Sequence, residues 1–311
     1  MAKTPTVFID GEAGTTGLEI RERLLHAGGL EVRSIAPDKR KDPAARKAQM
    51  AEADLVVLCL PDDAAKGAVA LAAELGSKAP RIIDASTAHR VAAGWVYGFP
   101  ELDKAQSGKI AKARLVANPG CYPTGAIALL IPLTDAGLMP KDFPATVNAV
   151  SGYSGGGRPM IESYEMAKTA PAFELYALGL EHKHVPELMA YTGLTTRPIF
   201  VPSVGNFRQG MLVSVPLHLD TLPSKPKAAD LLATLSEHYI GAKLVHVATA
   251  DETAKLSGRL DALALNETDK LELYVFANET HRHALLVARL DNLCKGAAGA
   301  AVQNIRLMLE G

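Results

Sequence analysis

One cysteine of this chain stands where the sequence changes from a turn to a long apolar segment. Cys121 lies in LVANPGCYPTGAIALLIPL, after the short apolar run 115–117 and the turn residues 118–120. This order predicts a strand, a turn and then a helix that begins near the cysteine. A helix N-terminus favours the thiolate, the nucleophilic form of the side chain. Covalent catalysis by Cys121 is therefore one interpretation, and a small buried hydrophobic residue is the other.

A second segment supplies the proton chemistry that a thiolate needs. His182, His184 and Glu187 stand within six residues in GLEHKHVPEL. A histidine can hold a thiolate as an ion pair and then act as a general acid. The alternative is a pair of surface histidines beside a helix start. The other cysteines suggest no activation, because Cys59 lies inside the apolar run LVVLCLP and Cys294 precedes the last helix without an activating neighbour.

Three glycines follow the first apolar run at regular spacing. Gly11, Gly14 and Gly17 in IDGEAGTTG come after a predicted strand and open a predicted helix. Glycines at such a turn let the backbone approach a pyrophosphate, whose charge meets the helix N-terminus. The position predicts a dinucleotide site, with a merely tight turn as the alternative.

A basic run follows the second predicted strand. That strand leads into SIAPDKRKD, with Lys39, Arg40 and Lys41 close together. A site that prefers NAD usually has an acidic residue here for the ribose hydroxyls, whereas a cationic cluster suits a 2′-phosphate. The run therefore favours NADP(H). A solvated charged loop, which also contains Asp38, is the alternative.

The first part of the chain alternates short apolar runs with helical segments. Helices are expected at 15–27 and 62–76. The strands are expected at 6–11, 30–36, 53–61, 81–86 and 114–118. Strands that alternate with helices form a parallel, doubly wound sheet with helices on both faces. An α/β fold with a Rossmann-like first domain is therefore predicted.

After about residue 140 the pattern changes to longer strands with few helices between them. Strands are expected at 211–219, 270–278 and 283–291, and the first of these alternates cleanly between apolar and polar residues. We expect an α+β domain with a largely antiparallel sheet, covered on one face by helices near 159–168 and 225–240.

Composition bounds the class of protein. The chain has 311 residues, of which 48% are apolar and 22% charged, with a formal net charge of -1. This balance argues against a broad nucleic-acid or membrane surface. No segment is apolar for long enough to cross a bilayer, and no signal peptide is visible. Three cysteines are too few for a disulfide framework, so we expect a cytoplasmic protein. No cluster has metal-ligand spacing, so no metal is expected.

Nine segments together resemble one enzyme family along nearly the whole chain. They are IDGEAGTTG, VVLCLPDDAA, DASTAHR, WVYGFPEL, NPGCYPTGAIALL, SGYSGGGR, EHKHVPEL, FVPSVGNFRQGM and LDNLCKGAAGAAVQN. The sequence is similar to the N-acetyl-gamma-glutamyl-phosphate reductases, and most to the shorter of their two types. The resemblance implies NADPH-dependent reductive dephosphorylation of N-acetyl-gamma-glutamyl phosphate to the semialdehyde, in arginine biosynthesis, through a cysteine thioester.

The resemblance also implies roles for individual residues. The nucleophile matches Cys121, and the acid/base histidine matches His184, with His182 as the alternate and Glu187 as the orienting carboxylate. The residues implied in cofactor binding are Gly11, Gly14, Thr15, Thr16, Gly17, Lys39, Arg40, Pro61, Ser86 and Asn292. Those implied in substrate binding are Arg90, Asn118, Ser151, Ser154 and Arg158.

The resemblance implies a domain organisation as well. Residues 1–117 would bind NADP(H), joined by the C-terminal helix 295–311, and residues 118–294 would form the catalytic and dimerisation domain. The expected partners are a small-molecule acyl phosphate and further copies of the chain, as a homodimer or homotetramer. Three alternatives stay open: aspartate-semialdehyde dehydrogenase, against which EHKHVPEL argues, a non-catalytic NADP-binding sensor, and a Cys-His hydrolase that leaves the glycine turn unexplained.

Overall fold

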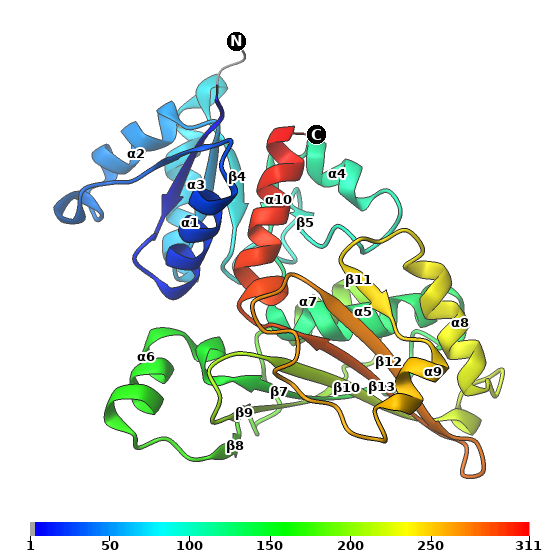
Figure 1. Cartoon of the computed structure of the whole chain (residues 1–311). Coiled ribbons are helices and arrows are strands. Elements are labelled where there is room, and N and C mark those ends of the chain that lie inside the picture. The colour runs from blue at the N-terminus through cyan, green and yellow to red at the C-terminus, as the bar shows by residue number, and fades with distance from the viewer. Residues whose placement is uncertain (1–3, 311) are drawn as a thin grey trace. The chain divides into compact units, whose positions relative to one another are not determined.

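The computed structural model describes residues 4–310 (Figure 1). The chain divides into two compact units. The first unit contains the residues as far as Pro100, the segment Lys104–Pro119 and the chain from Ala297 onward. The second unit contains Glu101–Asp103 and Gly120–Gly296. The described part of the chain has no helix long and apolar enough to span a membrane.

A parallel sheet forms the centre of the first unit. Its six strands have the order β2-β1-β3-β4-β6-β5, and each pair of neighbours is parallel. The strands are β1 (Thr6–Asp10), β2 (Glu31–Arg33), β3 (Leu55–Leu58), β4 (Arg81–Asp84), β5 (Val96–Tyr97) and β6 (Leu115–Ala117). Every residue of β1 and β3 is buried, as the middle of a sheet covered on both faces requires.

Helices cover both faces of this sheet. Successive residues of β1 point to opposite faces, so Val7 and Ile9 join one apolar core and Phe8 joins the other. The first core is completed by α1 (Thr15–Ala27), α4 (Gln106–Lys112) and α10 (Gly299–Glu310). The second is completed by α2 (Pro43–Glu52) and α3 (Asp62–Ala73). The predicted doubly wound α/β fold is confirmed.

The second unit is built on a seven-stranded sheet with the order β11-β12-β13-β10-β7-β9-β8. Its strands are β7 (Thr146–Gly152), β8 (Phe173–Leu175), β9 (Ile199–Gly205), β10 (Met211–His218), β11 (Val245–Val247), β12 (Leu271–Asn278) and β13 (His283–Leu290). The pairs β7–β9 and β11–β12 are parallel and the other neighbours are antiparallel. The prediction of a largely antiparallel sheet is thus confirmed, although two of its strand pairs are parallel.

Two helices cover one face of this sheet. Helix α5 (Cys121–Asp135) packs on β10, β12 and β13, and α8 (Ala228–His238) packs on β11 and β12. The contact of α5 is close, because a Cβ at Gly125 would lie 2.8 Å from Val213 Cγ2. The smaller helices of the unit are α6 (Gly157–Glu162), α7 (Val185–Thr192) and α9 (Ala250–Lys255).

The cover expected from a helix near 159–168 comes instead from α5. Helix α6 ends at Glu162 and continues as a π-helical turn, Ser163–Ala167, and it packs against this turn and the preceding 3-10 turn Tyr153–Gly156. The physical reason is burial: α6 has no buried residue, whereas α5 is buried from Tyr122 to Thr134. A helix that is apolar all round must be enclosed.

Pro132 lies inside α5 and has no N–H to donate to the Ala128 carbonyl. The structure supplies a replacement. The hydroxyl of Tyr239, a buried residue just beyond α8, donates to the Ala128 carbonyl oxygen at 2.9 Å. The carbonyl that the proline would leave unpaired is therefore satisfied by a side chain.

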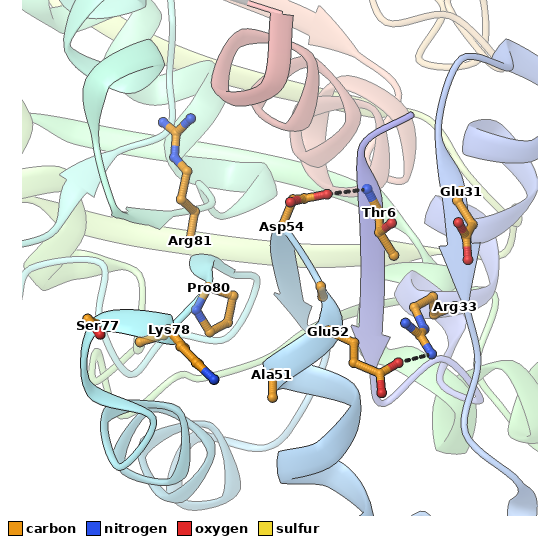
Figure 2. Close-up of a pocket in the computed structure, with 12 residues that line it drawn as sticks. Thr6, Glu31, Arg33, Ala51, Glu52, Asp54, Ser77, Lys78, Pro80 and Arg81 are labelled. Atoms are coloured by element: carbon orange, nitrogen blue, oxygen red, sulfur yellow. Dashed lines mark hydrogen bonds and ion pairs between the residues drawn. The ribbon is translucent and has the colours of Figure 1, made fainter. Parts of the chain in front are cut away.

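A pocket of about 640 Å³ lies at the amino ends of strands in the first unit (Figure 2). Thr6 at the start of β1, Asp54 just before β3 and Arg81 at the start of β4 line it. The glycine turn follows the carboxyl end of β1, the edge where open α/β sheets bind ligands. The pocket and the turn therefore lie at opposite edges of the same sheet.

Candidate functional site

The glycine turn after β1 is shaped by the chain's own close packing. Gly11 has φ +92°, and a Cβ there would lie 2.3 Å from the Cys59 carbonyl oxygen. A Cβ at Gly17 would lie 2.7 Å from the Gly11 carbonyl oxygen. Only glycine fits at these two positions, because the obstructing atoms belong to the backbone.

Gly14 has a different environment, which fits a phosphate. It is the exposed N-cap residue of α1, and a Cβ there would meet only the Gly11 carbonyl oxygen, at an ordinary 3.5 Å. The first turn of α1 has no acidic side chain, and Thr15 and Thr16 are half-buried. The helix N-terminus is therefore open to an anion, and the turn fits the pyrophosphate of a dinucleotide.

The basic run reaches this turn through Arg40. Its Nη2 donates to Glu12 Oε1 at 3.2 Å, whereas Lys39 is exposed in the 3-10 turn Pro37–Lys39. Glu12 also accepts a hydrogen bond from Ser34 Oγ at 2.8 Å and lies 3.6 Å from Arg21 Nη1. Glu12, Ser34 and Arg21 were not among the predicted site residues. The sequence feature that could have indicated this cluster is Glu12 itself, an acidic residue inside the glycine turn.

Pro61 and Ser86 follow the carboxyl ends of β3 and β4. Pro61 is the exposed N-cap residue of α3. Ser86 is buried, and its N–H and hydroxyl donate to Asp84 at 2.9 and 2.7 Å. Asp84 also binds His89 Nδ1 at 2.6 Å, and the His89 ring stacks on Trp95. The loop after β4 is thus fixed by a buried carboxylate.

Arg90 and Asn118 are brought together in the first unit. Arg90 is 8% exposed, and its Nε donates to the Asn118 carbonyl oxygen at 3.0 Å. The Asn118 side chain donates to the Ala297 carbonyl oxygen at 3.0 Å and accepts from Asn304 Nδ2 at 3.1 Å. This buried amide therefore ties the end of β6 to the last helix, and a direct role in substrate binding stays a prediction.

Cys121 is the first residue of α5, as the sequence indicates. The helix has 15 residues, its N-cap is Gly120 and its own first turn contains no acidic side chain. Cys121 is half-buried, and a Cβ at Gly296 would lie 2.8 Å from Cys121 Cβ. The π-helical turn Cys294–Ala298 thus packs directly on the cysteine.

The other two cysteines have different surroundings. Cys294 is 1% exposed. Burial, with smaller contributions from the nearby carboxylates of Asp84 and Asp10, raises the pKa of the Cys59 thiol to about 12. Cys59 is half-buried as a residue, and it packs against the apolar core that contains Val7 and Ile9. Neither cysteine is suited to be a nucleophile at neutral pH.

The histidine segment lies beside the start of α5. Gly120, just before the cysteine, donates its N–H to Glu187 Oε1 at 2.8 Å. The ring of Tyr122, just after it, lies 6.0 Å from the ring of His184 and 6.2 Å from that of His182. The second unit thus gathers the four predicted catalytic residues around one helix terminus. Glu187 thus binds the backbone beside Cys121, and its orienting role for a histidine stays a prediction.

His182 is the histidine of the pair whose protonation the structure defines. Burial lowers the pKa of His182 to about 4, with a smaller contribution from the charge of Lys183. His182 Nδ1 accepts the backbone N–H of His184 at 3.1 Å, which requires this nitrogen to be unprotonated. His182 is therefore neutral near pH 7. His184 is 6% exposed and is the N-cap residue of α7.

Two tyrosines complete this cluster, and the sequence patterns did not single them out. Tyr122 donates to the Ser203 carbonyl oxygen at 3.0 Å, and Tyr176 donates to the Tyr122 hydroxyl at 3.2 Å. Burial raises the pKa of both, and that of Tyr176 to about 12. They are therefore neutral hydrogen-bonding groups at neutral pH. Tyr176 is far from Cys121 in sequence, so no local pattern could have indicated it.

Part of the predicted substrate loop is assembled with Asn292. Asn292 Nδ2 donates to Ser154 Oγ at 2.9 Å, and Asn292 Oδ1 accepts the Gly210 N–H at the same distance. Ser151 is buried, and its hydroxyl donates to the Gly152 carbonyl oxygen. Arg158 lies apart from this group. Its side chain is 79% exposed and pairs with Glu162 one helical turn away, at 2.7 Å.

Within residues 4–310 the structure shows no group of three or more histidine, cysteine, aspartate or glutamate side chains arranged to hold a metal ion.

Two protein-family models match the chain. Residues 29–110 match the semialdehyde dehydrogenase NAD binding domain, and residues 121–292 match the semialdehyde dehydrogenase dimerisation domain.

Curated relatives are similar over almost the whole chain. The sequence is 53% identical over 310 residues to the N-acetyl-gamma-glutamyl-phosphate reductase of Chelativorans sp. (strain BNC1), with 99% of each chain covered. It is 54% identical over 310 residues to the reductase of the same name from Brucella ovis, with 98% of this chain and 99% of the relative covered.

Solved structures of low identity share the fold. Aspartate semialdehyde dehydrogenase II from Vibrio cholerae, solved as a complex with ASA, gives a TM-score of 0.71 at 15% identity over 99% of both chains. The Candida albicans aspartate semialdehyde dehydrogenase, solved with NADP, gives 0.66 at 12% identity over 98% of both chains. At such identities the likeness concerns the fold alone.

Proposed function

Because the chain belongs to the N-acetyl-gamma-glutamyl-phosphate reductase family, we propose that it reduces N-acetyl-gamma-glutamyl phosphate to N-acetyl-glutamate semialdehyde with NADPH, in arginine biosynthesis. It is an oxidoreductase of the semialdehyde dehydrogenase class. The observation that supports this chemistry best is the position of Cys121 at the start of α5, with His182, His184 and Glu187 beside the same helix terminus.

Cys121 is the proposed nucleophile. Its thiolate attacks the carbonyl carbon of the acyl phosphate, the carbon–oxygen bond to phosphate breaks, and a thioester on Cys121 remains. Backbone N–H groups at the start of α5 stabilise the negative charge that develops on the carbonyl oxygen. Arg90 is the proposed phosphate-binding residue, held by its bond to the Asn118 carbonyl.

His184 is the proposed acid. When bound, NADPH supplies the hydride that reduces the thioester. His184 then gives its proton to the departing Cys121 sulfur as the semialdehyde leaves. His182 is less suited to this step, because burial holds its pKa at about 4 and its Nδ1 accepts the His184 N–H. Glu187 keeps the backbone beside Cys121 in place through the Gly120 N–H.

The cofactor is NADP(H), and the first unit holds all the proposed binding residues except Asn292. The glycine turn, with Thr15 and Thr16, would receive the pyrophosphate at the N-terminus of α1. Arg40 and Lys39 would attract the 2′-phosphate. Pro61, Ser86 and Asn292 remain proposed contacts nearer the reacting end of the cofactor.

The second unit holds three of the proposed substrate-binding residues. Ser151 lies near the end of β7, Ser154 in the 3-10 turn that follows and Arg158 in α6, and Ser154 is already bonded to Asn292. Arg158 would have to leave Glu162 to act there. The match of residues 121–292 to a dimerisation domain supports a homo-oligomer, which we propose is a homodimer or homotetramer. We further propose that it works in the cytoplasm.

Substrate choice tests this function against its nearest rival. The purified protein should oxidise N-acetyl-glutamate semialdehyde with NADP+ far faster than aspartate semialdehyde at the same concentration. A site built for a neutral amide rejects a free amine, and the shorter chain would misplace the carbonyl carbon relative to Cys121. A preference for aspartate semialdehyde would favour aspartate-semialdehyde dehydrogenase. Inertness toward both would favour a sensor that only binds the nucleotide.

A further inference from the structure

An acidic residue lies where this fold usually binds the adenosine ribose. In NAD-binding domains of this kind, an Asp or Glu at the end of the second strand binds the ribose 2′-hydroxyl. Here Ser34 directly follows β2, and its hydroxyl donates to Glu12 at 2.8 Å. The carboxylate comes from the glycine turn, not from the second strand, yet it lies beside the end of that strand.

The same carboxylate lies against two arginines. Glu12 Oε1 accepts from Arg40 Nη2 at 3.2 Å, and Glu12 Oε2 lies 3.6 Å from Arg21 Nη1. The Glu12 side chain is only 5% exposed, whereas each arginine side chain is 39% exposed. The guanidinium groups can therefore receive an anion from solvent while the carboxylate stays behind them.

We propose that Glu12 sets the discrimination between NADPH and NADH. Arg21 and Arg40 attract a 2′-phosphate, and the negative charge of Glu12 opposes it at close range. Toward NADH the same carboxylate accepts the 2′-hydroxyl hydrogen bond that the second-strand acid accepts elsewhere. The site therefore combines an acidic residue, which is typical of NAD sites, with basic residues, which are typical of NADP sites. This proposal rests on NADP(H) being the cofactor and concerns a residue that the proposed reaction does not use.

Glu12 could instead serve only to hold the two arginines in position. Its removal would then free both guanidinium groups to move, and the affinity for a 2′-phosphate would fall. The two roles predict opposite signs for one substitution. Glu12→Gln removes the charge and keeps the size of the side chain, so it separates them.

The experiment measures binding without turnover. Isothermal titration of the whole protein with adenosine 2′,5′-bisphosphate and with 5′-AMP isolates the contribution of the 2′-phosphate. In Glu12→Gln the bisphosphate should bind roughly tenfold more tightly, because a close like charge has been removed. The nucleotide 5′-AMP should bind somewhat more weakly, because its 2′-hydroxyl loses a charged acceptor. An unchanged or weakened affinity for the bisphosphate would overturn the proposal.

A second substitution keeps the test decisive if Glu12→Gln folds poorly. Arg21→Gln should weaken bisphosphate binding roughly fivefold, since a charge-assisted contact is lost. Arg23→Gln is the matched control on the same helix, because Arg23 pairs with Glu19 at 2.9 Å. Equal effects of the two arginine substitutions would also overturn the proposal. Neither probe has a reacting group, so failure of the proposed reaction would leave this result standing.

Discussion

The three cysteines have the same thiol, and their surroundings decide which of them reacts. Cys121 lies at the N-terminus of α5, where the helix dipole favours the thiolate. Cys59 has a pKa of about 12, so at pH 7 only about one molecule in 10⁵ has a thiolate there. Cys294 is enclosed. Position in the fold therefore distinguishes the proposed nucleophile from the other two cysteines.

Alkylation should reveal this difference directly. Iodoacetamide at pH 7 should label Cys121 well before Cys59 or Cys294, because the thiolate is the reacting form and the helix N-terminus favours it at Cys121. Peptide mass spectrometry over a time course would measure the three rates. Cys121→Ser is the control that identifies the fast site. Equal rates at all three positions would show that Cys121 is not activated.

The two histidines should contribute unequally to turnover. His184→Asn should slow catalysis by roughly 10²–10⁴-fold, the usual loss when a positioned general acid is removed. His182→Asn should cost less, since its depressed pKa of about 4 leaves it neutral at pH 7. Steady-state rates of both variants at pH 7 are the measurement. A larger loss of turnover in His182→Asn than in His184→Asn would identify His182 as the general acid.

His182 also gives a pH signature in stability. Its pKa is lower in the folded protein than in the unfolded chain, so the unfolded state binds more protons between about pH 6.5 and 4. This contribution to stability is fully present above that window and is lost as the pH falls through it. His182→Asn should therefore flatten the decline in the urea midpoint over this window.

At the scale of elements, the mid-helix proline in α5 shows how a local defect is repaired by tertiary structure. The sequence predicts the helix and gives no account of Pro132. The answer lies in Tyr239, more than a hundred residues away, whose hydroxyl replaces the missing backbone donor to Ala128. A helix that begins with the proposed nucleophile is thus supported by a hydrogen bond to a carbonyl group at its middle.

Removing that hydroxyl should destabilise the protein. Tyr239→Phe leaves the buried Ala128 carbonyl without its donor, at a cost of about 1–3 kcal/mol in the free energy of unfolding. In a Pro132→Ala background the helix regains its own N–H donor, so the same substitution should cost less. Urea unfolding of the single and double variants measures this coupling. Equal costs in the two backgrounds would mean that the tyrosine does not compensate for the proline.

The elements with strong patterns were predictable from sequence, and the weak ones were not. The buried strand β1 and the alternating strand β10 fall close to their expected bounds. Strand β5 has only two residues and α4 has seven, too few for a periodic signal. The helix near 159–168 was expected to cover the sheet, but α6 ends at Glu162 and has no buried residue, and α5 covers the sheet instead.

Predictability of the site follows the same division. Cys121 and the glycine turn stand at junctions between elements, which the sequence marks with turn residues. Three residues near the site were not predicted: Glu12, Tyr122 and Tyr176. Glu12 is bonded to Ser34 and Tyr122 to Tyr176, and each pair joins segments that are distant in sequence. Arg158 has the charge expected of an anion-binding residue, but its side chain forms an ion pair with Glu162, one turn away in the same helix.

At the scale of the whole molecule, each unit accounts for one half of the proposed reaction. The first has the parallel sheet, the glycine turn and the bases near it. The second has the proposed nucleophile at a helix N-terminus, with the two histidines beside it. Relatives of 53–54% identity align over 310 residues, so the family membership extends across both units.

The central claim is that a thioester forms on Cys121 and exchanges with phosphate. In the oxidative direction this thioester can be released productively only by an acceptor, which should be inorganic phosphate. The most direct measurement is therefore the rate of N-acetyl-glutamate semialdehyde oxidation by NADP+ as phosphate is varied from none to saturation. The account predicts a rate that depends on phosphate, is abolished in Cys121→Ser, and requires more phosphate in Arg90→Ala without a matching change for NADP+. Sustained oxidation at full rate without phosphate would contradict it.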